Sequence, residues 1–285
     1  MTTHPSHSVR IRGLVPGDLP AALRLSTAFG WPHRLEDWAF MLSIGKGVAA
    51  IDQRAIVGVA LHWLYGEQHA TIGMVGVSPD LHGLGVGRRL MERTLKATGT
   101  RGVILHATEA GTPLYSRLGF QAGEAIHQFQ GTVFEEVLIP LPESDRLRPI
   151  GRSDPPALAA LDAEATGMRR SVLLAALGQS ATGVVLDRKG APAGFALLRR
   201  FGRGLVIGPV IAPDLTGAQA LIGHFLGSRS GQFVRIDVPA ECGLPTWLSQ
   251  LGLANVGTAL RMVRGTPPVV GTHARCFALA SQAFG

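Results

Sequence analysis

The sequence has few of the residues that build disulfide-linked, metal-binding or membrane-spanning structures. Its 285 residues include two cysteines, Cys242 and Cys276, whose separation matches neither a disulfide framework nor a metal-binding motif. No apolar run approaches the roughly 18 residues that a membrane span needs, and the first segment, MTTHPSHSVRIR, lacks the apolar core of a signal peptide. We therefore expect a soluble, cytoplasmic, bacterial-type enzyme with no metal site and no membrane partner.

Charged and aromatic residues are also sparse, at 16% and 6%, yet the net charge is +7. A basic surface without a ligand explains this charge as readily as an anionic partner does. A nucleic-acid partner would require clustered basic residues interleaved with aromatic ones, whereas these arginines are scattered along the chain. The composition therefore favours a small polyphosphate ligand over a nucleic acid.

What the sequence does contain is an internal repeat. VSPDLHG (77–83) returns as IAPDLTG (211–217), and LGFQAGEAIHQFQG (118–131) returns as LGLANVGTALRMVRG (251–265). The two pairs are offset by 134 and 133 residues, an agreement that chance rarely gives. The polar, proline-containing stretch 141–154 suits a linker. We expect two similarly folded domains, over residues 1–140 and 146–285.

The first half alternates helical and extended patterns, which is typical of an α/β fold. We expect a strand over 8–14, helices from Asp18 and over 34–45, a hairpin over 47–64, and a strand over 102–108. The strand expected over 69–79 is interrupted by Gly73 and Gly76. A bulge or a close backbone approach is the physical use of glycine at such positions.

An amphipathic helix is expected over 86–97. Gly83 and Gly85 precede this helix, and Gly87 is its second residue. Glycine permits positive φ, so consecutive backbone N–H groups can converge on an oxyanion in front of the positive helix end. The spacing fits neither a P-loop, which needs a following Lys-Ser or Lys-Thr, nor the G-x-G-x-x-G dinucleotide fingerprint. The loop therefore predicts a ligand that carries phosphate or pyrophosphate.

This stretch resembles the pyrophosphate loop of the GNAT superfamily of acetyl-CoA-dependent N-acetyltransferases, R/Q-x-x-G-x-G/A after a strand that ends in V-x-P. Val77, Ser78 and Pro79 match the strand end, and the loop reads His82, Gly83, Leu84, Gly85, Val86, Gly87, with histidine where the family usually has glutamine or arginine. TPLYSRLGF (112–120) resembles a second family signature, with Thr108 in place of a frequent asparagine. The repeat resembles tandem members, which implies two GNAT-like domains, each a mixed, mostly antiparallel twisted sheet flanked by helices, the second degenerate.

The resemblance implies acetyl-CoA as acyl donor and an amine as acceptor. Backbone N–H groups of Val75, Gly76 and Val77 would contact pantetheine and the thioester carbonyl. The cofactor site would also include the loop 82–87, Arg88 at the phosphates, and Thr108. Tyr115 would be the general acid for the leaving thiolate. Tyr115 could instead be a half-buried helix residue, and Arg88 a solvated one.

The acceptor site that the resemblance implies includes Trp31 and His33, whose aromatic wall suits a small or peptide-like amine. Trp38, on the inner face of its expected helix, is assigned to the core instead. His106 and Glu109 lie near the site in sequence, and Glu67 and His69 flank the preceding strand, but each fits a structural or solvated role. We therefore assign no general base, and direct attack by an amine deprotonated through water stays open.

The second half lacks the loop, because Gln219 and Leu221 stand where Gly85 and Gly87 do, and it contains no tyrosine. We expect it to shape the acceptor pocket or to stabilise the first half, as a monomer or homodimer. Its last segment, 274–285, is expected to hold a strand, with Cys276 buried rather than catalytic. A non-catalytic acyl-CoA sensor is the alternative, and a nucleic-acid-binding protein is a weaker one.

Overall fold

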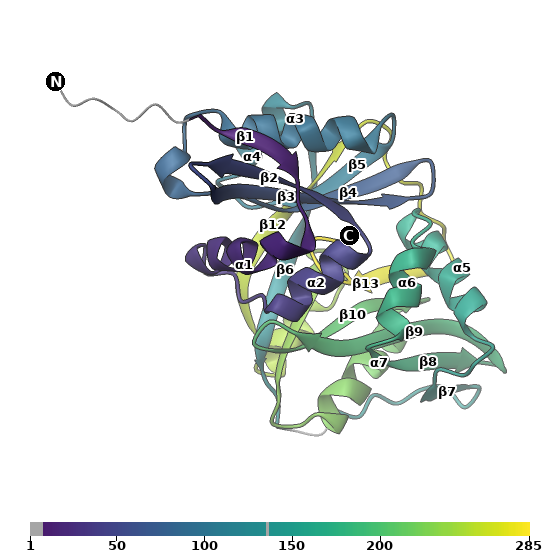
Figure 1. Cartoon of the computed structure of the whole chain (residues 1–285). Coiled ribbons are helices and arrows are strands. Elements are labelled where there is room, and N and C mark those ends of the chain that lie inside the picture. Colours follow the sequence, from purple (N-terminus) through teal and green to yellow (C-terminus); the bar gives the residue numbers. More distant parts are fainter. Residues whose placement is uncertain (1–7, 135–136) are drawn as a thin grey trace. The chain divides into compact units, whose positions relative to one another are not determined.

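The computed structural model describes residues 8–134 and 137–285 (Figure 1). Contacts divide the chain into two compact units, Met1–Leu64 with Ile72–Thr100, and Tyr65–Thr71 with Arg101–Gly285. The boundary between residues 140 and 146 stays a prediction, because it rests on the sequence repeat. Among the helices of the described residues, none is long and apolar enough to cross a membrane.

The first unit is an antiparallel sheet with helices packed against it. Its elements are β1 (Arg10–Gly13), α1 (Leu19–Ala28), α2 (Leu35–Ser43), β2 (Lys46–Asp52), β3 (Ala55–Tyr65), the end of β4 (His69–Val77) and α3 (Val86–Thr98). β2 lies between β1 and β3, with Ala50 opposite Ile11 and Gly58. These bounds confirm the predicted hairpin and the three predicted helices.

The core of the first unit forms where α3 packs against β2 (Figure 1). Val86 and Leu90 on the inner face of α3 belong to one buried cluster with Val48 and Ala50. Full burial of an aliphatic side chain contributes about 1.5–3 kcal/mol. Because side chains alternate across a strand, Ala49 faces the other side of the sheet, and α2 packs on that strand as well. The sheet therefore holds the start of α3 firmly, which positions the glycine loop before it.

The second unit contains a longer mixed sheet. Its elements are β5 (Gly102–Ala107), α4 (Thr112–Arg117), β6 (Gln121–Thr132), β7 (Asp145–Pro149), α5 (Pro155–Thr166), α6 (Ser171–Gly178), β8 (Thr182–Arg188), β9 (Ala191–Phe201), β10 (Gly204–Ala212), α7 (Leu215–Ser228), β11 (Phe233–Pro239), α8 (Pro245–Gln250), β12 (Ala254–Arg264) and β13 (Arg275–Ala278). The strand order is β5-β12-β6-β11-β10-β9-β8-β7, and β13 pairs with β10. Helix α7 packs on β9 and β10, and its Leu221 and Phe225 lie in the buried core with Ile236 of β11.

The two sequence halves exchange strands inside this unit. β12, from the second half, lies between β5 and β6 of the first half and pairs antiparallel with both. β6 in turn lies between β12 and β11, where Gln128 faces Asp237. Residues 102–132 therefore complete their sheet with a strand that follows them by more than a hundred residues. The sequence repeat gives no sign of this pairing.

The predicted linker is partly wrong, because Asp145–Pro149 within it forms the edge strand β7. β7 pairs antiparallel with β8, and Arg148 donates to Asp154 at 2.6 Å and to Asp187 at 3.0 Å. Asp145 accepts from Arg188 at 2.8 Å. Charged side chains on an edge strand discourage pairing with other chains and leave little apolar periodicity to detect. The polar composition that suggested a linker is the composition of a protected sheet edge.

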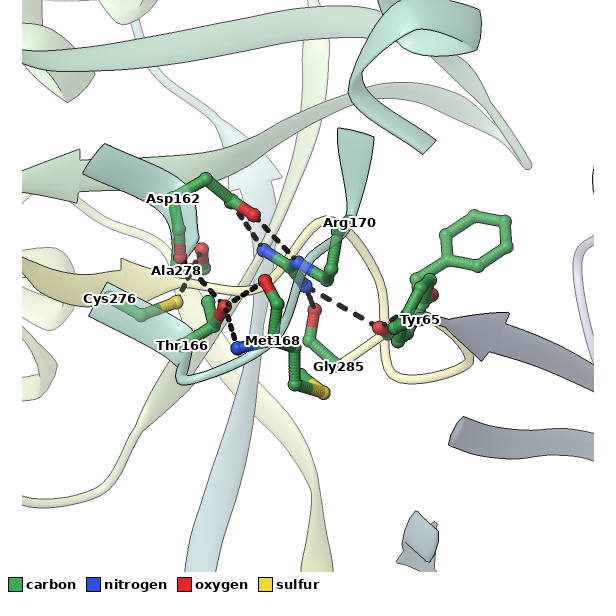
Figure 2. A network of polar contacts seen from close by, with 9 residues as sticks. Tyr65, Asp162, Thr166, Met168, Arg170, Cys276, Ala278 and Gly285 are labelled. Carbon is green, nitrogen blue, oxygen red and sulfur yellow. Dashed lines mark hydrogen bonds and ion pairs between the residues drawn. The ribbon is translucent and has the colours of Figure 1, made fainter. Parts of the chain in front are cut away.

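A buried arginine fixes the end of the chain to α5. Arg170 is 1% exposed, and it donates to the two carboxylate oxygens of Asp162 at 3.0 and 2.6 Å and to the carbonyl oxygen of Gly285 (Figure 2). Tyr65 donates to the carbonyl oxygen of Phe284 at 3.0 Å. Removing one partner of a buried ion pair typically costs 3–5 kcal/mol. The network therefore holds the last residues rigidly beside α5.

Candidate active site

The glycine loop of the first unit has the open geometry that an anion site needs. Gly83 and Gly85 have φ of 80° and 76°, the left-handed region that favours glycine. Gly85 is the N-cap of α3, and no side chain of the described residues caps that helix. A Cβ at Gly83 or Gly85 would meet no described atom within 4 Å. The first N–H groups of α3 therefore have no side-chain cap, and the glycines before them leave room for an oxyanion ligand.

Gly87 has a different conformation from the other two glycines. It is the second residue of α3 and is not among the described residues with positive φ. Two of the three glycines therefore adopt the left-handed backbone, and Gly87 lies in the first turn of the helix behind them. Because Leu84 is exposed and Val86 is buried, the turn directs one apolar side chain outward and anchors the next one in the core.

His82 ties the loop to the end of β4. Its Nε2 lies 2.9 Å from the carbonyl oxygen of Val77, so this nitrogen carries the proton and donates. In the neutral ring Nδ1 is then an acceptor, which has no proton to offer a phosphate. Arg88 is exposed and donates through Nε to Glu92 at 2.8 Å, one helical turn along α3. This surface ion pair draws the guanidinium of Arg88 along α3, toward the turn that follows the helix start.

Strand β4 carries a backbone irregularity beside the predicted thioester contacts. Met74 has φ of 54°, which is uncommon for a residue other than glycine, so the distortion falls on Met74 between the two glycines. Val75 and Val77 pack toward the α3 core. Gly76 faces the opposite side, where a Cβ would lie 2.3 Å from Cε2 of Phe29. Glycine is therefore required at position 76 so that this ring can cover the strand.

Phe29 begins a chain of aromatic contacts through the loop between α1 and α2. Its ring centroid lies 5.3 Å from that of Trp31, Trp31 lies 5.9 Å from His33, and His33 lies 6.4 Å from Trp38. Trp38 is fully buried and donates to Ser26 Oγ at 3.1 Å, which confirms its predicted core position. Sequence reasoning did not assign Phe29 to the site, although it lies two residues before Trp31. The structure places Phe29 beside Gly76, and Trp31 and His33 continue the row of rings from Phe29.

Thr108 and Tyr115 lie in the second unit. Thr108 precedes α4, and Tyr115 lies within it. Thr108 accepts at its carbonyl oxygen from the Thr112 backbone at 3.1 Å, and its Oγ1 accepts from Gly111 N at 3.3 Å. Thr108 therefore holds the start of α4. Tyr115 is 8% exposed, its ring contacts Phe120, and burial raises the pKa of its hydroxyl to about 12. Tyr115 therefore carries its proton at neutral pH.

His106 differs from the other candidate bases. Its Nδ1 donates to the carbonyl oxygen of Gln282 at 2.7 Å, and its buried Nε2 has no hydrogen-bond partner among the described residues. Burial lowers the pKa of His106 to about 4, so the ring is neutral at pH 7. His69 is also buried with a lowered pKa. Glu67 and Glu109 are exposed, in agreement with a solvated role.

The corresponding region of the second half is closed by its own side chains. Asp214 is the N-cap of α7, and its carboxylate accepts from Gly217 N at 2.8 Å and from Arg188 at 2.9 Å. Pro209 stands at the position that corresponds to Val75, where proline supplies no N–H. β13 pairs with β10 at residues 210–212, along the segment that corresponds to the end of β4. An anion therefore already occupies this helix start, and a strand occupies this sheet edge.

Comparison with known families identifies both halves. Two GNAT acetyltransferase domain models match, one over residues 44–122 and one over residues 158–278, together more than half of the chain. The chain belongs to the GNAT acetyltransferase family. It is a tandem member, because each half matches a domain of its own. This confirms the family and fold class that the two motifs and the repeat predict.

Known proteins match this tandem GNAT protein over nearly its whole length. The chain is 28% identical over 271 residues to the uncharacterized N-acetyltransferase YitH of Bacillus subtilis (strain 168), covering 92% of this chain and 94% of that protein. A putative acetyltransferase from Pyrococcus horikoshii has a similar structure, with a TM-score of 0.80, 19% identity and coverage of 100% and 99%. A tandem GNAT protein from the clavulanic acid biosynthesis pathway gives a TM-score of 0.65, 13% identity and coverage of 92% and 100%.

Acetyl transfer is the activity of this family, and acetyl-CoA is its general donor. The open N–H groups at the start of α3 fit a pyrophosphate, because they are uncapped and unobstructed. No group of three or more histidine, cysteine or acidic side chains in the described part of the chain is arranged to hold a metal ion. The hydrogen-bond donors of this site are backbone N–H groups, which suit an anion.

Proposed function

We propose that this GNAT protein transfers the acetyl group of acetyl-CoA to an amine of a small or peptide-like acceptor by direct attack. The single observation that supports this most is the contrast between the two helix starts. The N-terminus of α3 follows two left-handed glycines and is open, whereas the N-terminus of α7 is capped by Asp214. The first half thus keeps a pyrophosphate cradle that the second half has replaced with a carboxylate.

Acetyl-CoA supplies the acyl group and a thiol leaving group. Backbone N–H groups of Val75, Gly76 and Val77 orient the pantetheine arm and polarise the thioester carbonyl in this proposal. The loop 82–87 binds the pyrophosphate, with Arg88 adding positive charge. Thr108 positions α4, and the Tyr115 hydroxyl donates to the thiolate as the carbon–sulfur bond breaks. The neutral amine nitrogen attacks the carbonyl carbon and loses its extra proton to water, with Trp31 and His33 forming a wall of the acceptor site.

Release of free thiol from acetyl-CoA tests this function. Thiol release should rise when a pooled library of primary amines is added, and mass spectrometry should find one product that is heavier by one acetyl group. Coenzyme A binding should be measured calorimetrically on the same preparation. Tight binding of coenzyme A without amine-dependent thiol release would replace the enzyme with an acyl-CoA sensor.

A further inference from the structure

A cavity of about 340 Å³ lies within the second unit, and its lining includes none of the residues described above at the starts of α3 and α7. One wall is the sheet of β5, β12 and β6, and the opposite wall includes the end of α5 and the segment around β13. Its volume is at the lower end of the range for small-ligand pockets. Nothing in the proposed cofactor chemistry uses it.

Three polar side chains cross the sheet wall in a row, one from each neighbouring strand. His106 on β5 is paired with Arg261 on β12. On the other side of β12, the pairing with β6 shifts register at Arg261, next to Glu124 on β6. All three line the cavity. Because β12 comes from the second half, the exchange of strands places Arg261 between two side chains of the first half.

His106 offers a ligand one hydrogen-bond acceptor, its ring nitrogen Nε2. Its Nδ1 proton is held by the Gln282 carbonyl, which fixes the tautomer and leaves a lone pair on Nε2. Nε2 is buried without a partner among the residues that the structure describes. A buried acceptor left unpaired costs about 1–3 kcal/mol, so a hydrogen-bond donor placed there would recover that free energy. The group that fits His106 is an N–H or ammonium.

The remaining charges around the cavity have both signs. Glu124 and Glu241 supply carboxylates, and Arg261 and Arg275 supply guanidinium groups. In the described part of the chain, none of the four forms an ion pair within 4 Å. Burial raises the pKa of Glu124, although Arg261 and Arg275 oppose the shift. Glu124, Glu241 and Arg275 are exposed to solvent, and two charges of each sign around one cavity suit a ligand that carries both.

We propose that this cavity binds a small amine that also carries a carboxylate, an amino-acid-like zwitterion. Its ammonium donates to His106 Nε2 and faces Glu124 and Glu241, while Arg261 and Arg275 bind its carboxylate. This binding does not depend on the proposed acetyl transfer, so the two are tested separately.

Calorimetric titration of the full chain tests the binding, with each of the twenty L-amino acids as probe and with coenzyme A either absent or saturating. The best binder is then compared with its α-amide, which lacks the carboxylate, and with its N-acetyl derivative, which lacks the ammonium. We expect each modification to weaken binding about 10- to 100-fold, the range for a hydrogen bond to a charged group. No binding by any of the twenty in either condition, or equal binding of the α-amide, overturns the proposal.

Substitutions separate recognition from folding. Arg261→Gln should weaken binding of the free amino acid about 10- to 100-fold and leave binding of its α-amide unchanged. His106→Asn keeps an N–H for Gln282 but removes the Nε2 acceptor, so it should weaken binding of the free amino acid and leave binding of its deaminated analogue, which carries no N–H, unchanged. Arg203→Gln and Glu143→Gln, both exposed and outside the cavity lining, are the matched controls and should change nothing. An Arg261→Gln effect of equal size on the α-amide would show a structural role and overturn the assignment.

The two proposals fail in different ways. If amine-dependent thiol release is found but no amino acid binds with the specificity given above, the acetyl transfer stands and the cavity proposal falls. If an amino acid binds with that specificity but no amine raises thiol release, the cavity proposal stands and the acetyl transfer falls.

Discussion

At the scale of single residues, a few of the differences between the two halves have large consequences. Gly85 leaves the start of α3 open, and Asp214 closes the start of α7 with its own carboxylate. A carboxylate at a helix N-terminus is itself the anion that the macrodipole favours, so no phosphate is needed there. Tyr115 has no counterpart in the second half, which contains no tyrosine.

Replacing Tyr115 by phenylalanine tests its role as the acid. The change removes a proton donor without opening a cavity, because the ring and its contact with Phe120 stay. A general acid contributes typically about 100- to 10,000-fold, so kcat should fall within that range while coenzyme A affinity stays within a few-fold. Steady-state kinetics and calorimetry on both proteins measure this. An unchanged kcat where chemistry limits the rate would rule out the role.

The buried neutral His106 predicts a pH dependence of stability. Its pKa is about 4 in the folded chain and about 6.5 when unfolded, so the unfolded chain binds protons more strongly between these values. The unfolding free energy is therefore undiminished above pH 6.5 and falls as the pH drops toward 4, by as much as about 3 kcal/mol. The charges that act on the ring are Arg261, which lowers its pKa, and Asp237, which raises it.

Urea unfolding of wild type and His106→Asn at pH 7, 5.5 and 4.5 measures this dependence. The variant lacks the titrating ring, so its unfolding free energy should decline less steeply than that of wild type as the pH falls. Parallel pH profiles for the two proteins would contradict a buried, neutral histidine at this position.

At the scale of elements, local patterns predicted most of the structure. The amphipathic period of α3, the hairpin of β2 and β3 and the turn carrying Tyr115 are confirmed, because each depends on residues close together in sequence. The left-handed Gly83 and Gly85 were also predictable, since glycine alone adopts that conformation easily. Edge strand β7 was not, because ion pairs with Asp154 and Asp187 replace the apolar alternation that reveals a strand.

The parts that sequence could not predict depend on contacts between distant residues. No periodicity in the sequence predicts that β12 pairs with both β5 and β6. The cavity lined by His106 and Arg261 could therefore not be predicted. Likewise, the packing of Phe29 on Gly76 joins an α1–α2 loop to a strand end. The interruption of β4 was predicted at glycine, and the structure places the distortion on Met74, between Gly73 and Gly76.

The strand exchange predicts that a chain ending at residue 140 does not fold alone. Such a chain lacks β12 and β11, so β5 loses one partner and β6 loses both. Unpaired strand edges favour aggregation, and we expect the fragment to be insoluble or without a cooperative urea transition. Co-expression with residues 141–285 as a separate chain should restore a soluble complex. A monomeric fragment 1–140 with cooperative unfolding would contradict this.

At the scale of the whole molecule, the two halves have divided their roles. The first half keeps an open helix start, and the second half supplies β12 to the sheet and Arg261 to the cavity. The second half cannot duplicate the first half's site, because three separate features oppose it. These are the cap at Asp214, the missing N–H of Pro209 and the pairing of β13 with β10.

Calorimetry should therefore find one coenzyme A per chain. Gly85→Ala places a Cβ on a backbone with φ of 76° at the mouth of the cradle and should abolish binding. Gly190→Ala is the matched control, since φ there is 84° and a Cβ meets no described atom within 4 Å, so it carries the same backbone strain without affecting binding. Asp214→Gly should create no second site, because Pro209 and β13 stay in place. Two equivalent sites per chain, or full affinity in a folded Gly85→Ala protein, would place the donor elsewhere than at the start of α3.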